Sequence, residues 1–334
     1  MTVRNAGRVA AIAVSVLLAA MATTRARAQE FRWQLPAGFP EPAVPADNPM
    51  STAKVALGKM LFADSRLSIT GQYSCQSCHS PERAFTDGLM HSRGATGDAL
   101  SLNAPTLLNV AYNSSLGWRD AKLRTLEQQM HGPLFNKDPR ELGLAGREAL
   151  VERALLADDA VVSAFAAAFP GLDQPVSMDN VIRAIAAYER TLFAGHSAFD
   201  RYVFGGDHGA LSERQKAGMQ LFFSGRSGCA ACHGGVNFAG AWVDRDHAQA
   251  EPVFADTGTG EAVRVPTLRN LPLTAPYMHD GRFANLDQVL DHYERLAIDP
   301  AADRRLRRSP LTTAERALLR EFLLSLADGP KDVP

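Results

Sequence analysis

Two five-residue segments contain every cysteine of this chain. Residues 75–79 read Cys-Gln-Ser-Cys-His, and residues 229–233 read Cys-Ala-Ala-Cys-His. Each is a C-x-x-C-H motif, the attachment pattern of a c-type haem. The two thiols can form thioethers with the vinyl groups of one porphyrin, and the His that follows can ligate the iron. Two covalently bound haem c groups are therefore predicted, with the attachment and axial residues Cys75, Cys78, His79, Cys229, Cys232 and His233.

Two other uses of these cysteines are disfavoured. A structural zinc site needs four clustered Cys or His ligands. A thioredoxin-like redox site would use one C-x-x-C at a strand-to-helix turn. Neither explains why a His directly follows both cysteine pairs.

The N-terminal residues have the features of a cleavable export signal. Arg4 and Arg8 precede an uncharged apolar stretch over residues 9–22, and an A-x-A cleavage site occupies residues 26–28. We expect residues 1–28 to be a signal peptide, with a retained N-terminal anchor as the alternative. Because bacteria attach haem c outside the cytoplasm, this agrees with the cysteine motifs and predicts a periplasmic protein.

Length and charge limit the remaining possibilities. Without residues 1–28 the chain has 306 residues, which is enough for two domains. These residues include 31 basic and 36 acidic side chains, a formal net charge of −5. Nucleic acid is therefore a disfavoured partner. No later segment is apolar enough to span a membrane, so no membrane span is expected in the mature form.

Helical patterns dominate the mature chain. Residues 29–48 are rich in proline and are expected to form an extended arm that is not a packed element. Ser177 is a predicted N-cap and Gly195 a predicted stop for one helix, and Thr312 with Glu315 is a predicted capping box for another. The apolar face predicted for the first of these helices consists of Val181, Ile185, Tyr188 and Leu192. Long alternating strand patterns are absent, so the predicted class is mainly α.

The chain contains an internal repeat. The segments Gly-Lys-Met-Leu-Phe at 58–62 and Gly-Met-Gln-Leu-Phe at 218–222 precede the two haem motifs. The segments 104–109 (Ala-Pro-Thr-Leu-Leu-Asn) and 265–270 (Val-Pro-Thr-Leu-Arg-Asn) follow them. We therefore expect two tandem cytochrome c-like haem domains. Their predicted bounds are 49–205 and 206–334, with a glycine-rich link at 205–209.

The repeat also predicts a difference between the two irons. A helix is expected after each Pro-Thr-Leu segment, and within it Pro133 of the first half takes the place of Tyr293 in the second. A phenol can ligate iron, whereas a proline ring cannot. The second iron is therefore expected to be six-coordinate, with His233 and Tyr293 as ligands. The first is expected to have His79 on one side and an open face that can bind peroxide.

Two other residues are alternatives to Tyr293 as the second ligand of the second iron. Met278 ranks second and His279 third, and both lie in a loop before the same helix. His292 lies about 100° round the helix from Tyr293 and should face away from the apolar side. Considered alone, Tyr293 also fits a core tyrosine whose hydroxyl is satisfied elsewhere.

From about residue 48 to its end, the chain resembles the bacterial dihaem cytochrome c peroxidase and MauG superfamily. The resemblance rests on both C-x-x-C-H motifs and on the segments 84–88 (AFTDG), 103–109 (NAPTLLN), 126–129 (LEQQ), 132–134 (GPL), 264–270 (RVPTLRN) and 279–282 (HDGR). Tyr293 is similar to the MauG-like branch, including MbnH, because ordinary peroxidases place Met there. Many peroxidases also carry a removable distal His after the first haem motif; Ala95 stands at that position here, with His91 nearby.

The resemblance implies roles for individual residues near the first haem. Trp118 resembles the tryptophan that relays electrons between the haems. Gln129, Pro133 and Glu141 resemble the distal pocket of the peroxide-reactive haem. Glu141 would be the catalytic carboxylate, although this chain has two extra residues between Pro133 and Glu141.

The resemblance also implies a calcium site between the domains. Asn103 would supply a side-chain oxygen, and Thr274 and Pro276 would supply backbone carbonyls. Oxygen ligands of this kind suit Ca²⁺. Without the resemblance, Asn103 would be taken as a turn residue.

Three functions are compatible with this sequence. The first is a MauG-like enzyme that uses hydrogen peroxide to oxidise a partner protein, at Trp, through a high-valent state shared by both haems. Two family members act in this way, MauG on the precursor of methylamine dehydrogenase and MbnH on a copper-binding partner. The second is a cytochrome c peroxidase that takes electrons from a small c-type cytochrome. The third is a dihaem electron carrier without catalysis, which would have two six-coordinate irons.

Overall fold

The computed structural model describes residues 31–247, 250–329 and 331–334. The predicted signal peptide and its cleavage site lie outside these residues. Trp33–Pro334 form one compact unit. Within the described part of the chain, no helix combines the length and apolar character needed to cross a membrane.

The compact unit is built from helices joined by long loops, which confirms the predicted mainly α class. In chain order the helices are α2 (Thr52–Phe62), α3 (Cys75–Cys78), α4 (Leu126–Phe135), α5 (Glu148–Leu156), α6 (Asp159–Ala168), α7 (Met178–Glu189), α8 (Ala198–Val203), α9 (Glu213–Phe223), α10 (Leu286–Ile298) and α11 (Thr313–Leu324). Strands β1 (Phe254–Asp256) and β2 (Ala262–Arg264) pair antiparallel, with Ala255 opposite Val263. They form the only sheet among the described residues.

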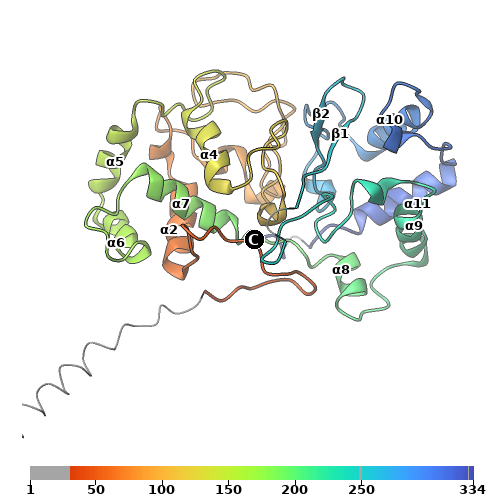
Figure 1. Ribbon diagram of the computed structural model, residues 1–334, viewed down its shortest axis with the longest axis horizontal. Coiled ribbons are helices and arrows are strands. Elements are labelled where there is room, and N and C mark those ends of the chain that lie inside the picture. Colours follow the sequence, from red (N-terminus) through yellow and green to blue (C-terminus); the bar gives the residue numbers. More distant parts are fainter. Residues whose placement is uncertain (1–30, 248–249, 330) are drawn as a thin grey trace, which may run out of the picture. The chain divides into compact units, whose positions relative to one another are not determined.

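Two separate hydrophobic clusters support the helices. One contains buried side chains from Leu57 to Ala194 and draws on α2 and α4 to α7. The other runs from Phe199 to Leu326 and draws on α8 to α11. Figure 1 shows the same grouping of helices, with β1 and β2 beside the second group. The change of cluster between Ala194 and Phe199 comes before the predicted link at 205–209, so we propose a domain boundary ahead of α8.

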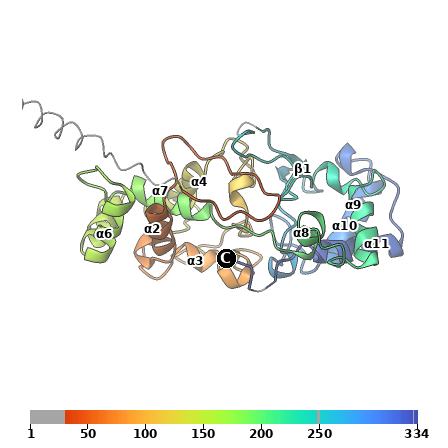
Figure 2. The same ribbon diagram turned by 90° about the horizontal axis from the view of Figure 1, so that it is seen from below.

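The repeat found in the sequence is also a repeat of helix packing. Helix α2 packs on α7, and α9 packs on α11; both pairs are visible in Figure 2. A Cβ atom at Gly58 would overlap the carbonyl oxygen of Ala184, and one at Gly218 would overlap that of Leu318. Each module therefore needs a glycine at the point where its two helices approach most closely.

Asparagine residues end the Pro-Thr-Leu segments in the same way in both halves. Asn109 and Asn270 both adopt a left-handed conformation, with φ of 57°. The Asn109 side chain binds the main chain of Ala194, just beyond α7. The Asn270 side chain accepts a hydrogen bond from the Asp328 N–H, just beyond α11. Each asparagine thereby connects the loop beside one haem motif to the segment that follows the packing helix.

The predicted helix starts are confirmed, but one predicted end is wrong. Ser177 caps α7 by accepting a hydrogen bond from the N–H of Asn180, and Thr312 forms the capping box of α11. Helix α7 ends at Glu189 and does not continue to Gly195. Leu192 lies beyond the helix, and its carbonyl oxygen accepts a hydrogen bond from the N–H of Asn109, at 2.7 Å.

The predicted arm is irregular but packed. Its described residues form neither helix nor strand. The Phe39 ring lies edge-on to Tyr112, with centroids 5.6 Å apart. Asn48 is fully buried and donates a hydrogen bond to Glu127. The expectation that this arm is not a packed element is therefore wrong, because aromatic and amide side chains between its prolines have partners on the helical body.

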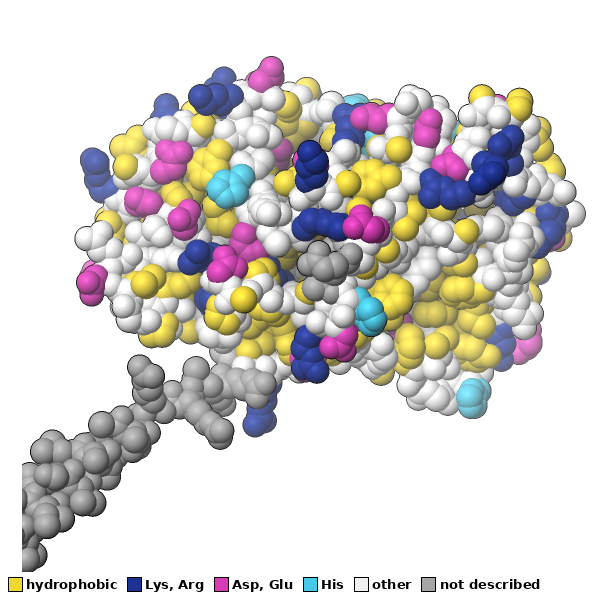
Figure 3. Space-filling model, in the orientation of Figure 1, with side chains coloured by type: hydrophobic (Ala, Val, Ile, Leu, Met, Phe, Trp, Pro, Cys, Tyr) yellow, Lys and Arg dark blue, Asp and Glu magenta, His cyan; other side chains and the backbone are white. Residues whose placement is uncertain are grey.

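The surface in Figure 3 mixes charges of both signs. Lys and Arg side chains alternate with Asp and Glu on the face drawn, with hydrophobic side chains between them. This face therefore shows no continuous basic surface of the kind typical of nucleic-acid-binding proteins.

Close packing at Gly218 gives a test of the fold. We expect Gly218→Ala to lower the free energy of unfolding by about 1–3 kcal/mol, because the added Cβ forces α9 away from α11. Gly225→Ala is the matched control, since Gly225 has no atom near its missing Cβ, and it should change stability by less than about 0.5 kcal/mol. Denaturant unfolding of the haem-loaded protein measures both. Equal stability of the two variants would contradict the described packing of α9 on α11.

Candidate haem sites and the segment between them

Each C-x-x-C-H motif opens onto a large cavity. Cys75, Cys78 and His79 line the first cavity, and Cys229, Cys232 and His233 line the second. Each cavity encloses about 1720 Å³ of atom-free space, part of it open to solvent. That space far exceeds the roughly 30 Å³ that one water molecule occupies. Both cavities thus bring the predicted attachment residues to the wall of a space large enough for a cofactor.

The two histidines are prepared to act as metal ligands. His79 Nδ1 lies 2.9 Å from the carbonyl oxygen of Phe85, and His233 Nδ1 lies 3.0 Å from that of Phe238. A carbonyl oxygen only accepts, so each Nδ1 carries the proton and each Nε2 keeps its lone pair. Burial lowers the pKa of both imidazoles, which also favours this neutral form. A hydrogen bond from Nδ1 to a backbone carbonyl oxygen orients a ligating imidazole. These residues fit a haem c in each cavity.

The helices that cross the two cavities present equivalent residues to them. From α10, the second cavity is lined by Leu286, Val289, Leu290 and Tyr293. From α4, the first cavity is lined at the same spacing by Leu126, Gln129, Met130 and Pro133, and also by Gly132 and Leu134. Pro133 and Tyr293 therefore stand at corresponding positions of two helices that each line a cavity. The described structure therefore presents a ring without donor atoms to one cavity and a phenol to the other.

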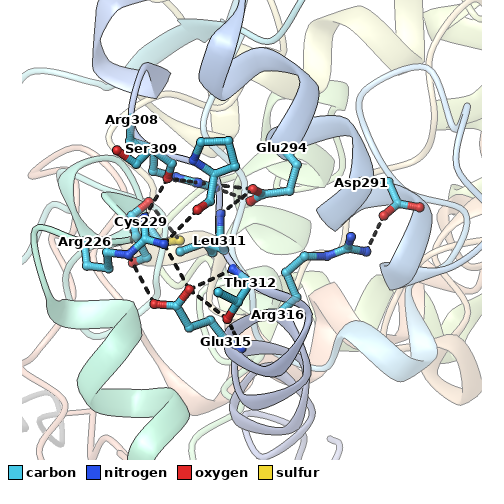
Figure 4. Close-up of polar contacts among 12 residues, drawn as sticks. Arg226, Cys229, Asp291, Glu294, Arg308, Ser309, Leu311, Thr312, Glu315 and Arg316 are labelled. Atoms are coloured by element: carbon cyan, nitrogen blue, oxygen red, sulfur yellow. Dashed lines mark hydrogen bonds and ion pairs between the residues drawn. The ribbon is translucent and has the colours of Figure 1, made fainter.

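Helix α10 is fixed by charged contacts next to Tyr293. Figure 4 shows Glu294 receiving hydrogen bonds from Arg308 and from the N–H of Leu311. One turn back, Asp291 pairs with Arg316 of α11. His292 does not line the cavity and binds the carbonyl oxygen of Thr257 at 2.8 Å. These contacts hold the helix so that Tyr293 faces the cavity.

A second set of polar contacts in Figure 4 involves Arg226, three residues before the motif cysteine Cys229. Arg226 binds Glu315 of α11 through two nitrogens, at 3.1 and 3.0 Å. The same guanidinium donates to the carbonyl oxygens of Ser309 and Pro310. The segment that leads into Cys229 is thus tied to α11.

The rival second ligands also lie at the second cavity. Met278 and His279 line it together with Tyr293. Burial raises the pKa of the Tyr293 phenol, so the side chain keeps its proton unless a cation is near. His279 is buried, and its ring centroid lies 6.3 Å from that of Trp118. Its Nδ1 has no hydrogen-bond partner among the described residues. Tyr293 remains the predicted ligand, since it alone of the three occupies the helix position that corresponds to Pro133.

Trp118 and Arg264 line both cavities. The indole N–H of Trp118 donates to the carbonyl oxygen of Asn103, at 3.1 Å. The N–H of Arg264 donates to the carbonyl oxygen of Trp118 at 2.9 Å, and its guanidinium carbon lies 5.1 Å from the indole ring. The structure therefore places the predicted relay tryptophan between the two candidate haem sites, with a cation against it.

The first cavity also contains the predicted distal residues and one more carboxyl. Glu141 and Gln129 line it as expected, and burial raises the pKa of Glu141. The N–H of Ala95 donates to the Glu141 carbonyl oxygen at 2.6 Å, which fixes the backbone there. Glu189, at the end of α7, also lines this cavity, and burial raises its pKa to about 8. Sequence reasoning missed Glu189, whose only signal was a charged residue directly after an apolar helix face.

The second cavity differs in charge from the first. Among the described residues that line it, none is Asp or Glu, whereas Arg305 and Arg308 reach it. Of the two cavities, only that of His79 has carboxyl groups among its described lining residues.

The predicted calcium residues lie together but without acidic neighbours. Asn103, Thr274 and Pro276 all line the second cavity. Asn103 donates its amide N–H to Leu89 O at 2.7 Å, so its side-chain oxygen remains available to a cation. No group of three or more His, Cys, Asp or Glu suited to a metal exists in the described ranges. The calcium assignment therefore stays a prediction based on one amide oxygen and backbone carbonyls.

His91 is not part of the first cavity in this structure. It is exposed, while the nearby Ser92, Arg93 and Gly94 line the cavity. Ala95, at the position where peroxidases carry a removable His, is buried against the Glu141 segment.

Comparisons with known proteins find relatives over most of this chain. The family model described as di-haem cytochrome c peroxidase matches residues 52–208. The methylamine utilization protein MauG of Methylorubrum extorquens is 35% identical over 291 residues, covering 82% of this chain and 78% of that protein. The cytochrome c551 peroxidase of Pseudomonas aeruginosa is 36% identical over 256 residues, covering 72% of each. A solved MauG-like protein associated with microbial copper homeostasis superposes with a TM-score of 0.83 at 37% identity, covering 89% of this chain and 96% of that one.

The cavities with their cysteine pairs and histidines, and the similarity over most of the chain, lead to one conclusion. This chain belongs to the di-haem cytochrome c peroxidase and MauG family of oxidoreductases.

Proposed function

We propose that this protein is a periplasmic, MauG-like enzyme that uses hydrogen peroxide to oxidise a tryptophan of a partner protein. It would hold two haem c groups, one on Cys75, Cys78 and His79 and the other on the second motif. A Ca²⁺ ion at Asn103 would complete its cofactors. The haem irons supply the redox chemistry with peroxide.

One observation carries this proposal, the contrast between Pro133 and Tyr293 at corresponding helix positions. Pro133 offers no donor atom to the cavity of His79, so a haem held there would keep a position free for peroxide. Tyr293 would offer a phenol oxygen to a haem held by His233, and a phenolate ligand would stabilise its oxidised iron. Oxidising equivalents would then be stored over both sites, which suits a substrate too large to reach either cavity.

Side chains of the first cavity would handle the protons of peroxide. Glu141, which lines this cavity, would accept the proton from one peroxide oxygen and return it to the other. Its raised pKa brings it nearer to neutral pH, where such a group works best. Trp118, which lines both cavities, would carry electrons between them. The similarity to a MauG-like structure at 37% identity supports the same class of reaction.

A second function is favoured by Met278, which also lines the second cavity. A thioether ligand would raise the reduction potential of that haem. The protein would then reduce peroxide with electrons from a small c-type cytochrome, as its peroxidase relatives suggest.

Replacing the predicted ligand tests the first proposal. We expect Tyr293→Phe to retain two haems but to change the ferric optical and magnetic-resonance spectra of one haem, because its iron loses the phenolate. Tyr277→Phe is the matched control, since Tyr277 lines the same cavity but binds the carbonyl oxygen of Leu271 at 2.8 Å. An unchanged spectrum in Tyr293→Phe, together with a changed one in Met278→Leu, would favour the cytochrome-coupled peroxidase.

The roles of the two carboxyls in the first cavity can be distinguished by the pH dependence of the reaction with peroxide. The reaction with peroxide should slow as pH falls through the raised pKa of Glu141, because only the carboxylate accepts a proton. We expect Glu141→Gln to reduce this rate about 10²–10⁴-fold and to remove that acidic limb. Glu189→Gln, which alters the other buried carboxyl, should retain it. The reverse result, measured by stopped-flow absorbance, would transfer the proton role to Glu189.

The substrate class has a direct test. A candidate partner protein, such as the product of a neighbouring gene, should gain an oxidised tryptophan when incubated with this enzyme and peroxide. Peptide mass spectrometry detects the change, with enzyme-free and Tyr293→Phe reactions as controls. Rapid peroxide consumption with a reduced small cytochrome, and no modified partner, would instead support the peroxidase function.

A further inference from the structure

Arg264 is a buried cation without an anion. Only 7% of its surface is exposed, and it stands at the end of β2. Its side chain forms no ion pair or hydrogen bond among the described residues, and its Nε has no partner. Burial lowers its pKa to about 10, which still leaves it charged at neutral pH. An unpaired charge at this depth is strongly unfavourable, so a ligand that supplies negative charge is expected.

Other arginines in this part of the chain have acidic partners. Arg119 binds Glu261 at 2.8 Å, and Arg269 binds Asp200 through two nitrogens at 2.8 Å each. Arg282 Nε lies 3.5 Å from Asp280, although this nitrogen makes no hydrogen bond among the described residues. Arg264 differs from all three, because no described carboxylate forms an ion pair with it.

The position of Arg264 identifies the chemistry of that anion. It is one of seven described residues that line both haem cavities, and the only charged one among them. Each haem c carries two propionate groups, and a guanidinium binds carboxylates through paired, charge-assisted hydrogen bonds. The hydrogen bond from its main chain to Trp118 and its 5.1 Å approach to the indole fix the side chain between the cavities.

We propose that Arg264 is a carboxylate-binding residue shared by the two haem sites, with its anion supplied by haem propionates. Its single positive charge then acts on both irons, because it lies at the wall common to their cavities. A positive charge favours the reduced form of each iron, so it raises both reduction potentials. Arg264 thus acts through the haems and takes no direct part in the reaction: its charge sets both reduction potentials from a position beside Trp118.

Two other arginines provide matched controls. Arg93 lines the first cavity alone, and Arg305 lines the second alone. A charge that serves one site should affect one haem. Arg264 differs from both in being shared.

The test is a spectroelectrochemical titration of both haems in the holoprotein, without peroxide or partner. Arg264→Gln should shift both potentials to more negative values, whereas Arg93→Gln and Arg305→Gln should each shift at most one. Arg264→Lys keeps the charge but loses the paired hydrogen bonds that a guanidinium donates to a carboxylate. Both potentials should therefore fall by less than in Arg264→Gln. A shift in one haem or in neither for Arg264→Gln would overturn the proposal.

The lysine variant decides the matter if Arg264→Gln does not bind two haems. A shift of the same sign in both haems of Arg264→Lys supports the shared site, and an unchanged pair or a single shifted haem overturns it. The proposal requires the two haems but not the peroxide reaction. Failure of the proposed function would leave the shifts in potential caused by the Arg264 variants unaffected, so the two outcomes are distinguishable.

Discussion

The hydrogen bond between each motif histidine and a backbone carbonyl is the interaction on which both sites depend. His79 and His233 can offer Nε2 to a metal only if Nδ1 keeps its proton, and the carbonyl oxygens of Phe85 and Phe238 ensure this. Both phenylalanines adopt a left-handed conformation, with φ of 58° and 50°. That conformation is uncommon for a bulky residue, and here it turns the carbonyl toward the imidazole in both modules. The sequence between motif and phenylalanine differs, but the constraint is the same.

Around these histidines the two modules share a frame and differ in what they present to their cavities. Gly58 and Gly218 allow the same close helix pairing, and Asn109 and Asn270 connect to the same place beyond the packing helix. Once such a frame is duplicated, a change at one position can alter chemistry without altering the fold. The difference between Pro133 on α4 and Tyr293 on α10 is such a change. Each residue stands on a helix whose place is already set by the shared packing of its module.

Most of this arrangement could be predicted because it follows from local patterns. The haem motifs, the repeat and the start of α7 at Ser177 are all visible in short stretches of sequence. Glu189 and Arg264 could not be recognised, because their importance comes from burial and from neighbours distant in the chain. The predicted end of α7 at Gly195 was wrong for a related reason: the segment beyond Glu189 makes hydrogen bonds with Asn109, which is distant in the sequence. Periodicity records which face of a helix is apolar, but not where a tertiary hydrogen bond ends it.

The distribution of charge explains why two similar cavities need not do the same work. Cleaving peroxide moves protons as well as electrons, and Glu141 and Glu189 give the first cavity two groups whose raised pKa values suit proton transfer. The second cavity has no carboxyl among its described lining residues and is bordered by arginines. An iron there can gain or lose an electron without a nearby proton carrier. Since Trp118 and Arg264 line both cavities, the proposed function would let electrons and electrostatic effects pass between them, while proton chemistry would stay in the first.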